Sequence, residues 1–408
     1  MVGSLPRFEA VGEKGGGVRV GSYCVEGTSL EEIRDGLLAE VDADGFAPGA
    51  CGLVICFLGA GARYVARELS EQLRNRLAPE AYLAVSCEGV IGGDRELERT
   101  PGAALFVADL PGVLLKPFAI GADDWEAICE DPRELRRRVC TPEQHRGQIL
   151  LADPFTTPID AVLPAFDAAT DGVTVGGMAS GSAQPGGNVL IVNDRICLDG
   201  AVGVGLGGAI RLETLVSQGC RPVGEPLLVT RSDGPYILEL RRRPAIEMLE
   251  ELLQTLPEED LLLFRRTGLF IGVAIDETRD EFRRGDFLVR GLQGVDRDRH
   301  AISVGEPVRP GQTIQLHVRD AGTAGEDLRE LLAPHRLDSP AGALLFSCNG
   351  RGSRMFETPN HDVSVTRAVL AGMPVAGFFA MGELGPVGGR TFIHGHTASF
   401  ALLRPDLP

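Results

Sequence analysis

Residues 343–352 read ALLFSCNGRG, and residues 380–397 read AMGELGPVGGRTFIHGHT. In each stretch an apolar strand runs into a glycine-rich corner that carries polar side chains. Glycine adopts positive φ without strain and lets other groups come close to the backbone. We therefore expect the two corners to form one pocket. Its candidate ligand-binding residues are Cys348, Asn349, Arg351, Glu383, His394 and His396.

The second corner has a counterpart earlier in the chain. Residues 85–93, VSCEGVIGG, are similar to residues 380–389, and both stretches place a glutamate just after an apolar strand. Glu88 is therefore a further candidate for the pocket. Each copy follows a strand and a helical pattern, at residues 52–58 and 63–76 and at residues 343–348 and 362–371.

The same order of elements can be followed twice more, at residues 148–207 and 226–319. Each β-α-β-β-β unit exposes an apolar sheet face that must pack against a partner. The sequence thus predicts an α/β (α+β) fold, with repeated β-α-β-β-β units forming two domains of paired sheets covered by helices. The expected boundaries are a flexible lead at 1–20, a first domain at 21–224 and a second at 225–408, with the crossing at 222–240.

Composition excludes several classes of partner. The chain of 408 residues has a net charge of −17, which opposes binding to nucleic acid or to anionic lipid. Its nine cysteines are odd in number and show no CxxC spacing, which is typical of reduced thiols in the cytoplasm. The apolar uncharged run at residues 368–382 contains Pro374 and is shorter than the roughly 20 residues that span a bilayer. We expect a cytoplasmic protein that binds neither nucleic acid nor membrane.

Several candidate residues also have a structural explanation. Cys348 has the alternative of a small core residue, and Asn349 of a side chain that bonds its own turn. Arg351 is either a ligand contact or a solvated loop residue. Glu383 either accepts a ligand ammonium or caps the amides of the turn.

The two histidines are expected to alternate along one strand. His394 and His396 would then point to opposite faces, one into the pocket and the other toward a helix or water. Two imidazoles at this spacing do not clamp one metal ion, and no third ligand is suitably spaced. The sequence predicts neither a metal site nor a bound cofactor.

Four motifs together resemble the FIST family, named for F-box and intracellular signal transduction proteins. They are residues 346–352, 374–379, 382–389 and 394–397. The resemblance extends over residues 30–404 and includes both the FIST N and the FIST C part, with the domain boundary predicted at residue 224. It implies a sensory module that binds small ligands such as amino acids. We expect the signal to pass through a separate signalling protein.

Three functions are consistent with these residues. A ligand-binding sensor is favoured over an enzyme, because the sequence has no serine elbow, P-loop or dinucleotide fingerprint. Arg351 and Glu383 in one pocket would match the two ends of a zwitterion such as an amino acid or a related metabolite. The alternative is a hydrolase or transferase that uses Cys348 as a nucleophile activated by His394 or His396. A scaffold that presents only a surface is the third.

Overall fold

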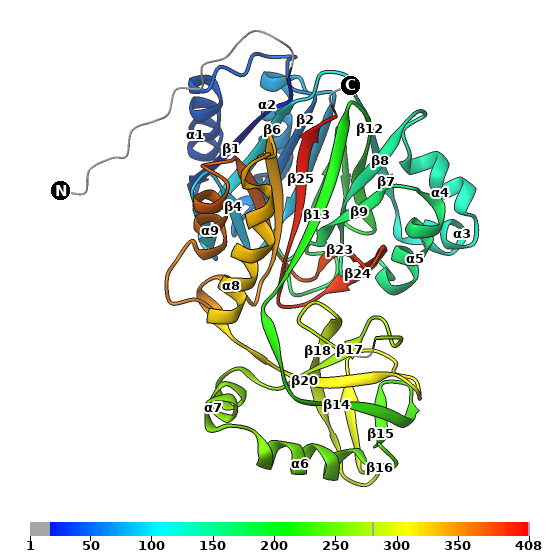
Figure 1. The fold of residues 1–408 in the computed structure, drawn as a ribbon. Coiled ribbons are helices and arrows are strands. Elements are labelled where there is room, and N and C mark those ends of the chain that lie inside the picture. The colour runs from blue at the N-terminus through cyan, green and yellow to red at the C-terminus, as the bar shows by residue number, and fades with distance from the viewer. Residues whose placement is uncertain (1–16, 280, 407–408) are drawn as a thin grey trace, which may run out of the picture.

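A computed structural model of the protein describes residues 17–279 and 281–406. Its strands form four sheets with helices packed on them, and the predicted α/β class is confirmed. Figure 1 shows three sheets packed together in the upper part of the molecule and the fourth below them. We term the upper part the three-sheet body (residues 17–219 and 320–406) and the lower part the inserted domain (residues 220–319).

Three segments of the body place their elements in nearly the same order. The first contains β1 (Arg19–Glu26), α1 (Leu30–Ala43), β2 (Leu53–Leu58), α2 (Ala66–Leu77), β3 (Ala81–Ser86), β4 (Gly89–Gly92), β5 (Arg95–Glu98) and β6 (Gly102–Asp109). The second contains β7 (Val113–Ile120), α3 (Trp125–Glu130), α4 (Pro132–Val139), β8 (His145–Ala152), α5 (Ile159–Ala169), β9 (Val173–Met178), β10 (Leu190–Val192), β11 (Arg195–Cys197) and β12 (Ala201–Gly208).

The third segment is interrupted by the inserted domain. It contains β13 (Ile210–Gln218), then α8 (Ala321–Leu332), β21 (Gly342–Cys348), α9 (His361–Val369), β22 (Val375–Ala380), β23 (Glu383–Val387), β24 (Arg390–His394) and β25 (Thr397–Pro405). Short 3-10 helices occur at η1 (Ala62–Val65), η2 (Ala122–Asp124), η3 (Ala333–Arg336) and η4 (Gly352–Arg354).

Each body sheet combines four strands of one segment with a hairpin from another. The strand orders are β1-β6-β2-β3-β10-β11, β7-β12-β8-β9-β23-β24 and β13-β25-β21-β22-β4-β5. The first segment thus lends β4 and β5 to the third, the second lends β10 and β11 to the first, and the third lends β23 and β24 to the second. This exchange closes a ring of three interlocked sheets.

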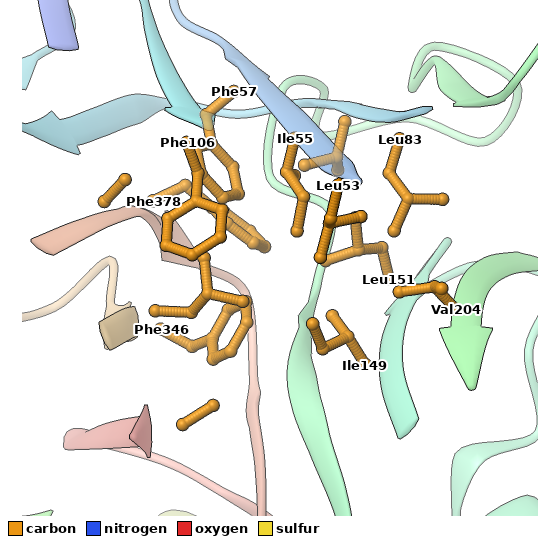
Figure 2. Packing of buried hydrophobic residues seen from close by; sticks show 14 of the residues in the cluster. Leu53, Ile55, Phe57, Leu83, Phe106, Ile149, Leu151, Val204, Phe346 and Phe378 are labelled. Atoms are coloured by element: carbon orange, nitrogen blue, oxygen red, sulfur yellow. The ribbon is translucent and has the colours of Figure 1, made fainter. Parts of the chain in front are cut away.

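The three sheets share one apolar core. Figure 2 shows Phe57 and Phe106 from one sheet, Ile149 from a second, and Phe346 and Phe378 from the third packed against one another. The rings of Phe57 and Phe378 lie 5.7 Å apart. The central strands are covered on both faces, and they therefore read as continuous apolar runs rather than alternating ones.

The outer helices bury one apolar stripe each. In α1, Ser29 and Glu32 form a reciprocal capping box, which satisfies free amides at the first turn. Residues at helical spacing then face the sheet, namely Ile33, Leu37 and Val41. None of the helices in residues 17–279 and 281–406 has the length and hydropathy needed to cross a bilayer.

The inserted domain has a different topology from the body segments. It contains β14 (Cys220–Asp233), β15 (Tyr236–Leu240), β16 (Arg243–Pro244), α6 (Ala245–Thr255), α7 (Glu258–Thr267), β17 (Phe270–Ala274), β18 (Phe287–Asp296), β19 (Ala301–Val304) and β20 (Thr313–Arg319). These strands form one sheet with its own apolar core. Its pairs are all antiparallel, whereas each body segment contains a parallel pair.

These observations correct two expectations about topology. The region predicted as a third β-α-β-β-β unit is the inserted domain, so three segments rather than four share one order. Residues 222–240 belong to β14 and β15 and do not cross between halves. The predicted boundary at residue 224 lies inside β14. Most of the predicted lead lies outside the described residues, and Arg19 and Val20 belong to β1.

The junction between the body and the inserted domain is narrow at the chain crossings. The Asp320 amide donates to the Gly219 carbonyl at 3.3 Å, so the two crossings lie side by side. Gln218 Nε2 donates to the Phe287 carbonyl at 3.0 Å, and Arg319 donates to the Gly350 carbonyl. The candidate residues of the C-terminal corners lie at this junction.

Candidate functional site

The first corner begins where β21 ends. Cys348 is the last residue of that buried strand, and its Sγ accepts from the Gly350 amide at 3.4 Å. Gly352 follows with φ of 57°, and a Cβ there would lie 2.6 Å from the Glu98 carboxylate. That carboxylate accepts from the backbone and hydroxyl of Ser353, so glycine allows the corner to fold onto β5.

Arg351 is fully buried and is held by an acidic partner from α9. Its Nε and Nη2 each donate to Asp362 at 2.8 Å, in a bidentate pair. Burial alone would raise the pKa of the Asp362 carboxyl, but the Arg351 guanidinium holds that pKa below its usual range. Ser347 donates to the same carboxylate at 2.9 Å. Arg351 is therefore not solvated, and its Nε–Nη2 edge is occupied by Asp362.

Glu383 is also fully buried, at the start of β23. Its Oε2 accepts from the Thr397 amide at 3.1 Å and from the Thr397 hydroxyl at 2.7 Å. Burial raises the pKa of Glu383 to about 8, although the bonds from Thr397 and the charge of Arg351 oppose the shift. The side chain is thus mainly a neutral acid at pH 7, with a proton to donate.

Arg351 and Glu383 lie in one buried cluster with Cys348 and His396. A Cβ added to Gly350 would lie 3.2 Å from His396 Nδ1 and 3.6 Å from Cys348 Sγ, so the His396 ring lies beside the first corner. Within the described residues, three buried atoms of this cluster lack a hydrogen-bond partner: Arg351 Nη1, Glu383 Oε1 and His396 Nδ1. Buried polar atoms are rarely left unpaired, so the cluster has capacity for further hydrogen bonds.

The expectation that His394 and His396 alternate along one strand is wrong. β24 ends at His394, and His396 lies in the turn before β25 with φ of 62°. The Nε2 atom of His394 donates to the Gly385 carbonyl at 2.9 Å, and the His396 ring packs edge-on against Phe270 of the inserted domain. Burial lowers the pKa of both imidazoles to about 4, so both are neutral at pH 7.

Glu88 and Asn349 lie on the other side of the first corner. Glu88 forms an ion pair with exposed Arg354 at 2.5 Å, and Arg354 also donates to the Asn349 carbonyl at 2.6 Å. This partly exposed network includes Arg99, 3.8 Å from Glu88. Glu88 and Glu383 occupy the same place in their segments, before β4 and at the start of β23, yet one is paired near the surface and the other is buried.

The two histidines face a cavity of about 290 Å³ between the body and the inserted domain. The remaining lining comes from α5 and β24 on one side and from β18 and the turn after β19 on the other. Its charged groups are Asp160, Arg290 and Glu306, and its apolar groups are Ile159, Val289 and Ile393. The volume is near the lower end of the roughly 300–1,000 Å³ typical of small-molecule sites, which are frequent between domains.

The sequence does not predict Asp362 or the three charged cavity residues as parts of the site. It predicts Asp362 only as the start of a helix, because nothing in the local sequence links this residue to Arg351. Asp160, Arg290 and Glu306 lie in unrelated stretches that the tertiary structure brings to one cavity. Thr397, by contrast, belongs to the HGHT motif at residues 394–397.

Comparison with known proteins agrees with the resemblance of the C-terminal motifs. The FIST N domain profile matches residues 52–243, and the FIST C domain profile matches residues 245–386. The chain belongs to the FIST family. FIST domains are generally sensory domains of signal transduction.

Relatives in this family occur in mycobacteria. The chain is 39% identical over 340 residues to "Uncharacterized protein Rv0628c" of Mycobacterium tuberculosis H37Rv, covering 82% of this FIST chain and 86% of that relative. It is 43% identical over 334 residues to "Uncharacterized protein Mb0898c" of Mycobacterium bovis, covering 81% and 84%. The match therefore extends over most of both proteins.

Solved structures give a distant likeness. A crystal structure of a cyanuric acid hydrolase from A. caulinodans aligns with 96% of this chain and 100% of its own at a TM-score of 0.36 and 9% identity. A second cyanuric acid hydrolase aligns at a TM-score of 0.33 and 10% identity. At these TM-scores the likeness supports no inference about this FIST protein.

The chemistry around Cys348 does not favour the nucleophile alternative. Burial, and then the nearby Glu383 carboxylate, raise the pKa of the thiol above its ordinary value. An activated cysteine requires the opposite shift, toward thiolate. Neither imidazole bonds Sγ among the described residues, because His394 faces Gly385 and His396 Nδ1 has no partner.

Proposed function

We propose that this FIST protein is a sensor in intracellular signalling that binds a small metabolite, such as an amino acid or a related compound, at the junction between the body and the inserted domain. The observation that carries the proposal is the cavity of about 290 Å³ lined by His394 and His396. A ligand there would touch both parts of the molecule.

The buried cluster lies next to this cavity and supports the same proposal. His396 belongs to both, since its ring lines the cavity and its Nδ1 lies beside the Gly350 corner. Glu383 connects to the junction through Thr397, which follows His396 directly. Cys348, Arg351 and Glu383 would therefore form the rigid wall that positions the imidazole, while Glu88 and Asn349 hold the far side of the corner.

A ligand that touches both parts would bias their relative position. The inserted domain is joined to the body by two adjacent crossings and by direct bonds, which include the ion pairs of Arg284 with Asp327 and Glu330 of α8. Binding energy that depends on this position shifts the population of conformations. A separate signalling partner would then recognise the ligand-bound arrangement.

The test is a thermal-shift screen of amino acids and related metabolites on three proteins. Gly291 lines the cavity and Gly294 does not, yet both lie in β18, and an added Cβ meets no atom within 4 Å at either position. We expect a ligand to stabilise the wild type and Gly294→Val, by about 2.7 kcal/mol at 100 times Kd. Gly291→Val adds three carbon atoms to the lining of the cavity and should weaken or remove the effect.

Two outcomes would contradict the proposal. One is that no metabolite in the screen stabilises the wild type. The other is that a ligand stabilises Gly291→Val as strongly as Gly294→Val, which would place its site elsewhere.

A further inference from the structure

The charged groups of the junction cavity come from separate parts of the chain. Asp160 lies in the first turn of α5, Arg290 in β18, and Glu306 just after β19. Arg290 Nε donates to Glu306 at 2.7 Å, and both side chains are mostly buried, with 15% and 21% exposed. The body therefore contributes one carboxylate, and the inserted domain contributes an ion pair.

These groups leave the cavity with one excess negative charge. The two imidazoles are neutral at pH 7, so the lining charges are Asp160 and Glu306 against Arg290. Within residues 17–279 and 281–406, Arg290 Nη1 donates only to the neighbouring carbonyl of Val289, at 3.3 Å. The guanidinium thus has donors in addition to the one that Glu306 occupies. A ligand ammonium would pair with the carboxylates, and a ligand carboxylate would take the remaining donors of Arg290, so each charge of a zwitterion has a partner of opposite sign in the lining.

The uncharged wall restricts the ligand further. Ile159, Val289 and Ile393 line the same cavity, and they favour an apolar side chain over a polar one. The backbone of Gly291 and Gly305 gives space on the side of the inserted domain.

From these groups we infer that the junction cavity binds a small zwitterion with an apolar side chain, whose carboxylate contacts Arg290 and whose ammonium contacts Asp160 and Glu306. This inference rests on the proposed sensor function and deepens it. It also moves charge recognition from Arg351 and Glu383, which are held inside the body, to residues that face the cavity. The ligand would link Asp160 of the body to Arg290 of the inserted domain and so hold the junction closed.

The test measures binding of three matched probes to the full chain by calorimetry. L-leucine carries both charges, 4-methyl-2-oxopentanoate lacks the ammonium, and isopentylamine lacks the carboxylate. We expect leucine to bind, and each analogue to bind at least about tenfold more weakly, as the loss of one charge-assisted bond requires.

Variants identify the contacts. Arg290→Met and Asp160→Asn should each weaken leucine binding by about tenfold or more, while Arg243→Met should not. Arg243 belongs to an exposed ion pair with Glu251, outside the cavity, and is the matched control. Asp160 is exposed, so its amide variant tests the site even if Arg290→Met fails to fold.

The inference is overturned if the keto acid or the amine binds as tightly as leucine, or if both Arg290→Met and Asp160→Asn bind leucine like the wild type. It is also overturned if a metabolite of a single charge, but not leucine, stabilises the wild type and fails on Gly291→Val; the sensor function would then stand with a different ligand. If no compound of any class binds, the sensor function itself fails.

Discussion

At the scale of single residues, the ionisation of Arg351 and Glu383 depends on the partners that each has inside the body. Arg351 has a bidentate partner in Asp362, whereas Glu383 is hydrogen-bonded to neutral donors, which include the amide and hydroxyl of Thr397. The first arrangement stabilises both charges, and the second favours the protonated acid. Arg351 and Glu383, which the sequence predicts as the two charged contacts of one pocket, therefore differ in ionisation.

Glu383→Gln should change how stability depends on pH. The raised pKa of about 8 means that Glu383 stabilises the folded wild type fully below about pH 4.5, and that this contribution is lost as the pH rises toward 8. Glutamine keeps the acceptor for Thr397 and does not ionise. Between pH 5 and pH 9 the variant should therefore gain about 2 to 4 kcal/mol relative to the wild type.

Urea unfolding at a series of pH values measures this difference. Glu247→Gln, at a half-exposed position of α6, is the control and should give a profile parallel to the wild type. Parallel profiles for Glu383→Gln and the wild type would show that Glu383 is ionised in the folded protein at pH 7.

At the scale of elements, the parallel strand pairs depend on glycine at close approaches. A Cβ on Gly377 in β22 would lie 1.7 Å from the Leu345 carbonyl oxygen of β21. Gly176 in β9 has the same relation to Leu150 of β8, at 1.8 Å. Two of the three body segments thus have a glycine in the strand that lies parallel to and beside β8 or β21.

Gly377→Ala should destabilise the protein by about 3 kcal/mol, the upper end of the usual cost of overpacking, because the methyl group must displace backbone rather than a side chain. Gly294→Ala, in β18, meets no atom within 4 Å and should change stability by less than about 1 kcal/mol. Chemical denaturation of both variants makes the comparison. Equal, small effects would mean that β21 and β22 tolerate a wider separation.

At the scale of the whole molecule, the exchanged hairpins make the body one folding unit. β4 pairs with β22, β10 with β3, and β23 with β9, so no body segment contains all the strands of its own sheet. The inserted domain, by contrast, has its own sheet and apolar core. Its ends lie side by side at Gly219 and Asp320.

A chain that joins residue 219 to residue 320 through a short Gly-Ser linker should therefore keep a folded body. A chain that ends at residue 219 should not fold, because its sheets lack β21, β22, β23 and β25. Circular dichroism melting and size-exclusion chromatography distinguish the two. A cooperative transition in the truncated chain, with aggregation of the linked body, would contradict the interlocked arrangement.

The sequence by itself determined most of the local structure. The predicted strands at residues 52–58 and 343–348 agree with β2 and β21 to within one residue at each end, because apolar runs flanked by turn residues depend on neighbours along the chain. The glycine corners and the strand that ends at Cys348 were predicted for the same reason.

Only the tertiary structure decided the sheet partners and the site. The local sequence of β4 is compatible with pairing inside its own segment and with pairing to β22. Hydrogen bonds between strands that are distant in the sequence determine that β4 pairs with β22. Packing of separate elements pairs Arg351 with Asp362 and brings Asp160 and Arg290 to the lining of one cavity. The local spacing of apolar residues indicates which face of a helix or strand is buried. The partner of a charged residue depends instead on which elements pack together in the folded protein.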